Sequence, residues 1–549
     1  MSQRDEKICV NLHSQSYTIV KAAVVFTLAL VFSAFIHASS GHDVPAWGDL
    51  GDGNFANPVL NADYSDPDVI RVGDKYYMTC SEFHFMGMPV LESDDMVNWR
   101  IIGQVYDRMD FPGYDGMTKY AEGTWAPALR YHDGRFRIFV CTPEEGLFMT
   151  SAADPAGPWE LLHLVKGIAK WEDPCPFWDE DGEAYLVRSR HRAGPIIIHR
   201  MSADGRTLLD DGVTVYEGPV AEGPKMFKKD GYYYISIPEG GVGEGWQTIL
   251  RSRNIYGPYE SRRVLETGST KVNGPHQGAL VDTPDGDWWF YHFQSAGVRG
   301  RVVHLQSVRW EDGWPLIGCD YDGNGVGEPM AVGPMPFGKS RSSFTPQTSD
   351  EFDGQKLGVQ WQTNHNPVRE NISLSEREGW LTLSPLSAGW LRMARNQLTQ
   401  KIMGFRSQAE TAIDFSDMKP GDRSGLECIG KAFTGAGVMI EDAGGDAVPM
   451  LYMEVDSVVT FRKPLSGTSD GGTLVIRLDV DTEANRFAYS YSTDGVDFRP
   501  MGEPFEMKSG FWKGVRTGLY AYTLSPVTGK THFDYFRYRH DGAGNHTYQ

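Results

Sequence analysis

Five residues that can exchange protons, bind metals or stack on sugars open five related phrases of this chain. Each phrase continues with a short apolar run, an Asp-Gly or Gly-Asp turn and an aromatic-rich run, and the phrases recur roughly every 50–60 residues between positions 66 and 292. Such a period predicts the blades of a β-propeller, whose innermost strands start at one end of a central axis. The sequence therefore predicts a funnel that collects three carboxylates, an imidazole and an indole. The five residues are Asp66, Trp125, Asp173, Glu222 and His276.

Two of these carboxylates could hydrolyse a glycosidic bond with inversion at the anomeric carbon. That reaction needs a protonated acid beside the leaving oxygen and an ionised base that activates water, about 6.5–9.5 Å apart. Asp66 and Glu222 open non-adjacent blades, which predicts a separation of this size across the funnel. Asp173 opens a blade between them, and its negative charge is expected to keep the acid protonated and to orient it.

The carboxylates and His276 could also have purely structural roles. Asp66 and Asp173 precede prolines, and Asp-Pro pairs are common in turns. Glu222 could be a solvated carboxylate at a strand edge, and His276 a buried structural histidine. Five aligned copies of the phrase favour the functional interpretation of the carboxylates.

The elements that position these residues are predicted to be strands. Between residues 50 and 330, short alternating runs and turn signals dominate and helical periodicity is almost absent, as expected of a propeller. Residues 331–349 are rich in Pro, Gly, Ser and basic side chains and are interpreted as a linker. Residues 350–541 continue with strand-like segments but without the phrase, which predicts a β-sandwich of two sheets. The whole chain is expected to be all-β.

The charge and the first 40 residues indicate the partners and the location. A formal net charge of −20 argues against nucleic acid, which requires a basic surface, and favours a neutral carbohydrate. Lys21 precedes an apolar run over 22–36, and small residues follow at 38–40. Residues 1–40 are therefore interpreted as a signal peptide, whose cleavage would give a secreted or periplasmic protein with no stable membrane insertion. An uncleaved anchor is the alternative, because the segment before the apolar run is unusually long.

Several phrases at and between the candidate residues resemble a known family. The phrases are Asn57-Pro-Val-Leu, Tyr64-Ser-Asp-Pro-Asp, Ser81-Glu-Phe, Trp125-Ala-Pro-Ala-Leu, Glu222-Gly-Pro, Gly300-Arg, Trp310-Glu-Asp-Gly-Trp-Pro, Asp350-Glu-Phe and Leu357-Gly-Val-Gln-Trp. In this order along the chain they resemble glycoside hydrolase family 43, and the last two are similar to the C-terminal domain of its β-xylosidase-like members.

The resemblance implies a five-bladed β-propeller followed by a concanavalin-like β-sandwich. It implies an inverting, exo-acting enzyme that cleaves terminal β-D-xylosyl or α-L-arabinofuranosyl residues from plant hemicellulose or its oligosaccharides. In that case Asp66 is the general base, Glu222 the general acid, and Asp173 the residue that tunes and orients the acid.

The resemblance also implies the residues that bind the sugar. Arg301 would bind hydroxyls, with Phe83 and Trp125 as apolar walls. No cofactor is required for catalysis, although His276 matches an axial histidine that holds a water or a structural calcium ion in the propeller channel.

The chain departs from the xylosidase pattern around the pocket. Ser65 stands where a proline usually precedes the base, Met86-Gly-Met replaces a Pro-Gly phrase, and Asp173-Pro-Cys-Pro replaces an Asp-Ala-Ser type of segment. These departures leave the choice between xylose and arabinose open. An endo-arabinanase, and a carbohydrate-binding propeller without catalysis, are the alternatives to the exo-acting enzyme.

Overall fold

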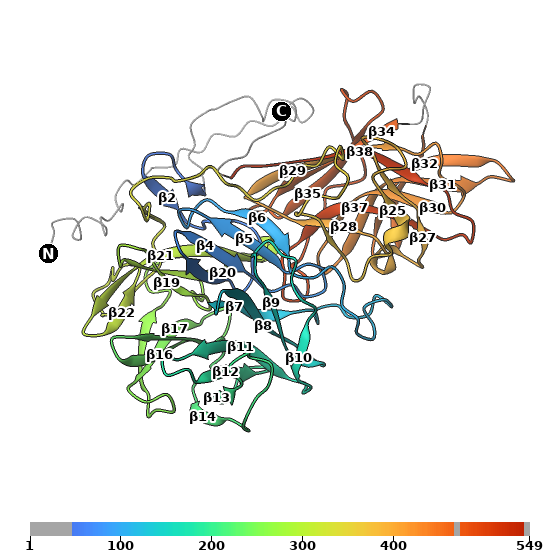
Figure 1. The fold of residues 1–549 in the computed structure, drawn as a ribbon. Helices are drawn as coiled ribbons and strands as arrows, with labels where there is room; N and C mark the ends of the chain where they lie inside the picture. The colour runs from blue at the N-terminus through green and yellow to red at the C-terminus, as the bar shows by residue number, and fades with distance from the viewer. Residues whose placement is uncertain (1–46, 466–472, 543–549) are drawn as a thin grey trace, which may run out of the picture.

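The computed structural model describes residues 47–465 and 473–542, so the predicted signal peptide lies outside the described residues. Within these ranges the regular elements are strands, apart from three short 3-10 helices, η2 (Gly297–Arg299), η3 (Arg369–Asn371) and η4 (Leu391–Met393). No helix in this part of the chain has the length and apolar character needed to cross a membrane. A propeller, coloured blue to green, lies beside a sandwich coloured orange to red (Figure 1).

Five antiparallel four-stranded sheets, consecutive in sequence, form the blades. The first strand of each blade lies beside the first strand of a neighbouring blade, so β3, β7, β11, β15 and β19 surround the axis. The blades are β3 (Asp68–Val72), β4 (Lys75–Thr79), β5 (Pro89–Ser93) and β6 (Arg100–Gln104); β7 (Trp125–His132), β8 (Arg135–Thr142), β9 (Gly146–Ala152) and β10 (His163–Lys166); β11 (Trp171–Trp178), β12 (Ala184–Arg190), β13 (Ile196–Met201) and β14 (Val213–Tyr216); β15 (Lys225–Lys229), β16 (Tyr232–Glu239), β17 (Trp246–Ser252) and β18 (Glu260–Leu265); β19 (Leu280–Asp282), β20 (Trp288–Ser295), β21 (Arg301–Glu311) and β22 (Trp314–Ile317).

Asp-Gly turns close the first hairpin of several blades, as the repeated phrase predicted. Asp133 and Gly134 have φ values of 50° and 70°, and Asp230 and Gly231 have 50° and 73°. Positive φ at both central residues is the mark of a type I′ turn, whose twist matches that of the strands it joins. Aspartate and glycine adopt this conformation at little cost, so the turn chemistry fixes the hairpins locally.

Near the start of each innermost strand one residue has the left-handed conformation, just before β3, β15 and β19 and within the first three residues of β7 and β11. A proline follows this residue in four blades and Gly278 follows it in the fifth, so backbone and sequence define the same position. The residues that hold it, with φ between 38° and 57°, are Asp66, Ala126, Asp173, Gly223 and Gln277.

The alignment of the five candidate residues is therefore corrected by one position in two blades. Asp66 and Asp173 hold the left-handed position itself, whereas Trp125, Glu222 and His276 stand one residue before it. The sequence alignment confused two adjacent positions near the strand entry, because both carry side chains able to do chemistry.

The C-terminal part is a sandwich of two antiparallel sheets, apart from one parallel pair between β27 and β37. On β34 the buried residues alternate with partly exposed ones, as expected of a strand with one face in a core. One sheet has the order β24-β28-β37-β30-β31-β32-β33, and the other β25-β26-β38-β29-β34-β35-β36. Their strands are β24 (Gln362–Thr363), β25 (Ile372–Ser373), β26 (Leu381–Leu383), β27 (Leu386–Ser387), β28 (Leu398–Lys401), β29 (Arg406–Asp414), β30 (Asp422–Ile429), β31 (Phe433–Asp442), β32 (Ala447–Val455), β33 (Val458–Pro464), β34 (Thr473–Asp481), β35 (Arg486–Ser492), β36 (Arg499–Pro500), β37 (Arg516–Thr523) and β38 (Thr531–His540).

The segment interpreted as a linker contains a strand. β23 (Val332–Pro334) pairs with β2 (Asn54–Ala56), which pairs in turn with β1 (Gly48–Asp49). This small sheet ties the end of the propeller to its start.

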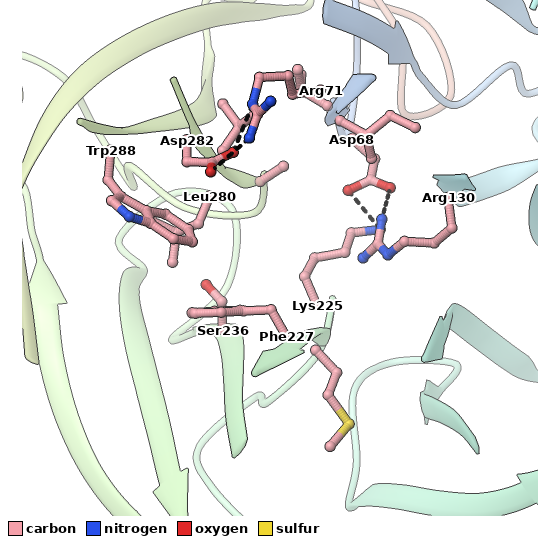
Figure 2. A pocket seen from close by; sticks show the side chains of 14 residues that line it. Asp68, Arg71, Arg130, Lys225, Phe227, Ser236, Leu280, Asp282 and Trp288 are labelled. Carbon is pink, nitrogen blue, oxygen red and sulfur yellow. Dashed lines mark hydrogen bonds and ion pairs between the residues drawn. The ribbon is translucent and has the colours of Figure 1, made fainter. Parts of the chain in front are cut away.

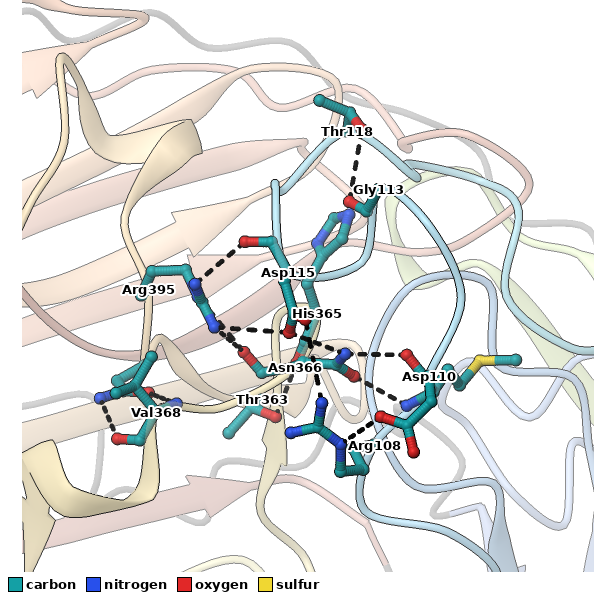
Figure 3. Close-up of polar contacts among 12 residues, drawn as sticks. Arg108, Asp110, Gly113, Asp115, Thr118, Thr363, His365, Asn366, Val368 and Arg395 are labelled. Atoms are coloured by element: carbon teal, nitrogen blue, oxygen red, sulfur yellow. Dashed lines mark hydrogen bonds and ion pairs between the residues drawn. The ribbon is translucent and has the colours of Figure 1, made fainter. Parts of the chain in front are cut away.

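Blade one and the sandwich share one apolar core and a seam of polar contacts. Buried residues of the propeller such as Tyr64 pack in one cluster with sandwich residues such as Met403. At the seam, the Asn366 side chain accepts a hydrogen bond from Met109 N and donates one to Met109 O, both at 2.8 Å (Figure 3). Arg395 of the sandwich donates to the backbone carbonyl of Asp115 in the propeller at 2.9 Å.

A buried ion cluster strengthens this seam. The Glu82 carboxylate of the propeller lies 2.6 Å from Lys401 Nζ and 2.6 Å from Arg516 Nη2 of the sandwich. Burial alone would raise the pKa of Glu82, but the two cations outweigh it and hold the pKa below its ordinary value.

Candidate active site

Asp66, just before β3, forms an ion pair with an arginine. Arg301 Nη1 lies 2.8 Å from Asp66 Oδ1, while the hydroxyls of Ser81 and Ser65 donate to Oδ2 at 2.5 and 3.0 Å. Arg301 also donates to Ser65 Oγ at 2.9 Å. The serine that replaces the usual proline thus links the two predicted site residues Asp66 and Arg301, which the fold brings together.

The sandwich helps to fix Arg301. Asp63 accepts the backbone N–H of Arg301 on one carboxylate oxygen and that of Gly514, from the sandwich, on the other, both at 2.9 Å. Gly300 has φ 77°, and a Cβ there would lie 2.3 Å from Asp63 Oδ1 and 2.5 Å from Gly514 N. Glycine is therefore required at this close approach of the two domains.

Asp173 and Glu222 meet on the other side of the site. The Asp173 carboxylate accepts a hydrogen bond from Gly223 N at 2.7 Å and from Ser189 Oγ at 3.1 Å. Burial, followed by the negative charges of Glu222 and Asp66, raises the pKa of Asp173 to about 7. Asp173 is thus protonated much more readily than an ordinary aspartate.

Glu172 is a third carboxylate in this group, and the sequence interpretation missed it. Oxygens of Glu172, Asp173 and Glu222 lie within 4.8 Å of one another. Burial, and next the charge of Asp173, raise the pKa of Glu172 to about 9. An alignment of the phrases on their shared proline would have identified Glu172, because Glu172-Asp-Pro then aligns with Glu222-Gly-Pro.

Asp66 lies outside this group of three, but its charge contributes to the raised pKa of both Asp173 and Glu172. The four carboxyls therefore share one electrostatic environment. The 6.5–9.5 Å separation expected between Asp66 and Glu222 stays a prediction.

His276 lies at the axis beside the candidate acid. Its side chain is fully buried, Nδ1 lies 2.6 Å from Gly274 O, and Nε2 lies 3.8 Å from Glu222 Oε1. Nδ1 must carry the proton to donate to that carbonyl, so Nε2 is free to accept a hydrogen bond. Of the two occupants that the sequence left open, a water needs only Nε2 and Glu222. Calcium needs six to eight oxygen ligands and would also have to use Asp173 and Glu172, whose oxygens lie within 4.8 Å of that of Glu222.

Aromatic side chains line the approach to the carboxyls. The predicted walls Phe83 and Trp125 pack edge to face with ring centroids 6.1 Å apart. Trp125 also lies 5.4 Å from the His191 ring and 6.4 Å from Trp512. Trp512 belongs to the sandwich and is 55% exposed. The second domain therefore adds an aromatic that the repeat could not predict.

Further along the same innermost strands lies a cavity of about 180 Å³ (Figure 2). Asp68 of β3 pairs there with Arg130 of β7 at 2.7 Å and with Lys225 of β15 at 3.8 Å. Asp282 of β19 pairs with Arg71 of β3 at 2.9 Å. The Asp68–Lys225 pair joins blades across the axis and the other two pairs join neighbouring blades, so we assign this cavity a structural role.

Comparisons with known proteins agree with this architecture. Residues 55–315 match the profile of glycosyl hydrolases family 43, and residues 349–539 match that of the β-xylosidase C-terminal concanavalin A-like domain. The five-bladed propeller and concanavalin-like sandwich predicted from the sequence are thus confirmed.

Three similar proteins span most of this chain. It is 54% identical to a putative β-xylosidase of Xylanibacter ruminicola, over 87% of this chain and 88% of the relative. It is 28% identical to a non-reducing end α-L-arabinofuranosidase of Bacteroides ovatus, over 89% and 96%. A solved family 43 structure from Bacillus licheniformis is 25% identical and superposes with a TM-score of 0.76, over 88% and 99%. The chain therefore belongs to glycoside hydrolase family 43 and is a hydrolase of glycosidic bonds.

Proposed function

We propose that this enzyme removes single β-D-xylosyl or α-L-arabinofuranosyl residues from the non-reducing ends of plant hemicellulose or its oligosaccharides, with inversion at the anomeric carbon. The observation that carries the proposal is the contrast between Asp66, ion-paired with Arg301, and the crowded carboxyls around Glu222. The β-xylosidase and α-L-arabinofuranosidase names of the two relatives support the two sugars.

The mechanism divides proton transfer between these groups. Asp66, paired with Arg301, takes a proton from the water that attacks the anomeric carbon. Glu222 gives its proton to the departing oxygen, and Asp173, bonded to Gly223 N, orients the backbone from which Glu222 projects. Arg301 also binds hydroxyls of the terminal sugar.

The experiment is a pair of conservative substitutions. Asp66→Asn and Glu222→Gln each lower kcat/KM by about 10²–10⁴-fold on the nitrophenyl β-D-xylopyranoside and α-L-arabinofuranoside. Asp133→Asn, in an exposed turn of the same propeller, is the matched control and keeps wild-type activity. Near-wild-type turnover by either site variant would contradict the assignment, and the better wild-type substrate identifies the pentose.

Exo action is supported by Trp512, which the sandwich places beside Trp125 at the approach to the site. An exo enzyme releases only monosaccharide from a linear pentose oligosaccharide. The endo-arabinanase alternative releases shorter oligosaccharides first, and a non-catalytic binding propeller releases nothing.

We also propose that the enzyme is secreted or periplasmic, because Lys21, the apolar run over 22–36 and the small residues at 38–40 have the order of a signal peptide. N-terminal sequencing of the protein recovered outside the cytoplasm tests this. A mature chain that still begins before residue 22 would contradict cleavage.

A further inference from the structure

Every blade has a residue at the position that Glu172 holds, and the polar or aromatic side chains at this position in other blades face the site. Like Trp125, Glu222 and His276, Glu172 stands one residue before the left-handed residue at a strand entry. Glu222 and His276 approach one another to 3.8 Å at the axis. The Glu172 carboxyl likewise reaches the funnel, within 4.8 Å of those of Asp173 and Glu222.

Contacts on its far side place Glu172 toward the rim. Its Oε1 accepts a hydrogen bond from Ala193 N at 3.3 Å, and its Oε2 lies 3.3 Å from His191 Nδ1. The His191 side chain is 30% exposed and packs against Trp125. Glu172 therefore lies between the candidate acid Glu222 and the partly exposed aromatic edge of the site.

The substrate orientation follows from the proposed exo-glycosidase function, on which this inference rests. The terminal sugar occupies the side of Asp66 and Arg301, and the departing group extends from Glu222 toward solvent. We propose that Glu172 is a substrate-binding residue on the leaving-group side, whose carboxyl hydrogen-bonds a hydroxyl of the departing sugar.

The protonation of Glu172 suits this role. With a pKa of about 9, the group is a neutral carboxylic acid at pH 7, with one O–H to donate and oxygens to accept. A sugar hydroxyl can also do both, so the pairing places no unpaired charge in the buried site. A neutral Glu172 also adds no negative charge beside Asp173 and Glu222.

The test compares a substrate that has a departing sugar with one that lacks it. Kinetics are measured for wild type, Glu172→Gln, Glu172→Leu and Glu172→Ala on the preferred nitrophenyl pentoside and on the disaccharide of the same pentose. The ratio of kcat/KM, disaccharide over nitrophenyl pentoside, is expected to fall at least about tenfold in the Leu and Ala variants. It stays within about threefold of wild type in Glu172→Gln, whose amide also donates and accepts.

Glu180→Gln, a change to an exposed carboxylate of the same blade, is the matched control and leaves the ratio unaltered. Equal losses on both substrates in Leu and Ala, or a displaced pH profile on the nitrophenyl pentoside, would show that Glu172 acts through the catalytic carboxyls and would overturn the proposal. An unaltered ratio in all variants would overturn it as well. A wild type inactive on both substrates would contradict the proposed function instead.

Discussion

Replacing Glu82 by glutamine tests whether the sandwich is an integral support of the active site. Glu82 and Arg516 are each 1% exposed and Lys401 is 5% exposed, so Glu82→Gln leaves two cations buried without their anion. At an effective dielectric constant of about 20, each N–O pair at 2.6 Å is worth roughly 6 kcal/mol, of which desolvation offsets a large part. Removing one partner of a buried pair typically costs about 3–5 kcal/mol, and we expect that loss of unfolding free energy here.

The same substitution is expected to affect catalysis as well, because Glu82 lies in the sequence between two residues of the site, Ser81 and Phe83. Ser81 donates to the Asp66 carboxylate and Phe83 packs on Trp125, so loosening the seam displaces both. Glu82→Gln is therefore expected to lower kcat/KM on the nitrophenyl pentoside even at temperatures where the protein stays folded.

Urea denaturation and steady-state kinetics measure the two effects. Glu376→Gln, which removes an exposed pair with Lys530, is the control and changes stability by no more than about 0.5 kcal/mol. Replacing the cluster by Leu at 82 and Met at 401 and 516 recovers much of the stability, because no unpaired charge remains. The depressed pKa of Glu82 means that its stabilisation is present above about pH 4 and is lost as the pH falls through the folded-state pKa. A Glu82→Gln protein within about 1 kcal/mol of wild type at pH 7 would refute the reasoning.

Three further predictions concern the site. NMR of a β-xyloside digest should show α-xylose as the first product, and β-xylose first would contradict a base that activates water. As the pH rises from about 4 to 9, the stability of the wild type should fall relative to that of Glu172→Gln. The pKa of Glu172, near 9 in the folded state, lies above its unfolded value, so the native state holds an extra proton that it loses over this range. Melting temperatures that differ equally at pH 4 and pH 8.5 would contradict this. Trp512→Ala should raise KM on a pentose disaccharide about 2–10-fold with a smaller change in kcat, since an aromatic face is lost at the approach to the site, and an unchanged KM would exclude that contact.

Local chemistry explains what the sequence predicted well. The repeated phrase encodes its own hairpins, since turns such as Asp133-Gly134 adopt the conformation that a tight antiparallel turn needs. The period of these hairpins predicted the blades, and the blades brought Asp173, Glu222 and His276 together without any knowledge of long-range contacts.

The remaining features depend on register and on tertiary contacts. Glu172 was missed because the phrase was aligned on Asp173, which hides the carboxylate one residue before it, and only the shared proline fixes the register. Trp512 could not be predicted, because it reaches Trp125 from a separate domain some 390 residues later. The contact between Asp63 and Gly514 is equally invisible in the sequence.

The two adjacent positions at each strand entry explain how one funnel can place its carboxyls in different electrostatic environments. At the left-handed position a short aspartate can hydrogen-bond to nearby groups, as Asp66 does with Ser81 and Asp173 with Gly223 N. One residue earlier, a longer side chain such as Glu222 projects toward the axis, where other carboxyls crowd it. Arg301 pairs with Asp66 on one side, whereas on the other side burial and the charge of Glu222 raise the pKa of Asp173. The asymmetry that acid–base catalysis needs thus arises because successive blades carry different side chains at the same repeated backbone turn.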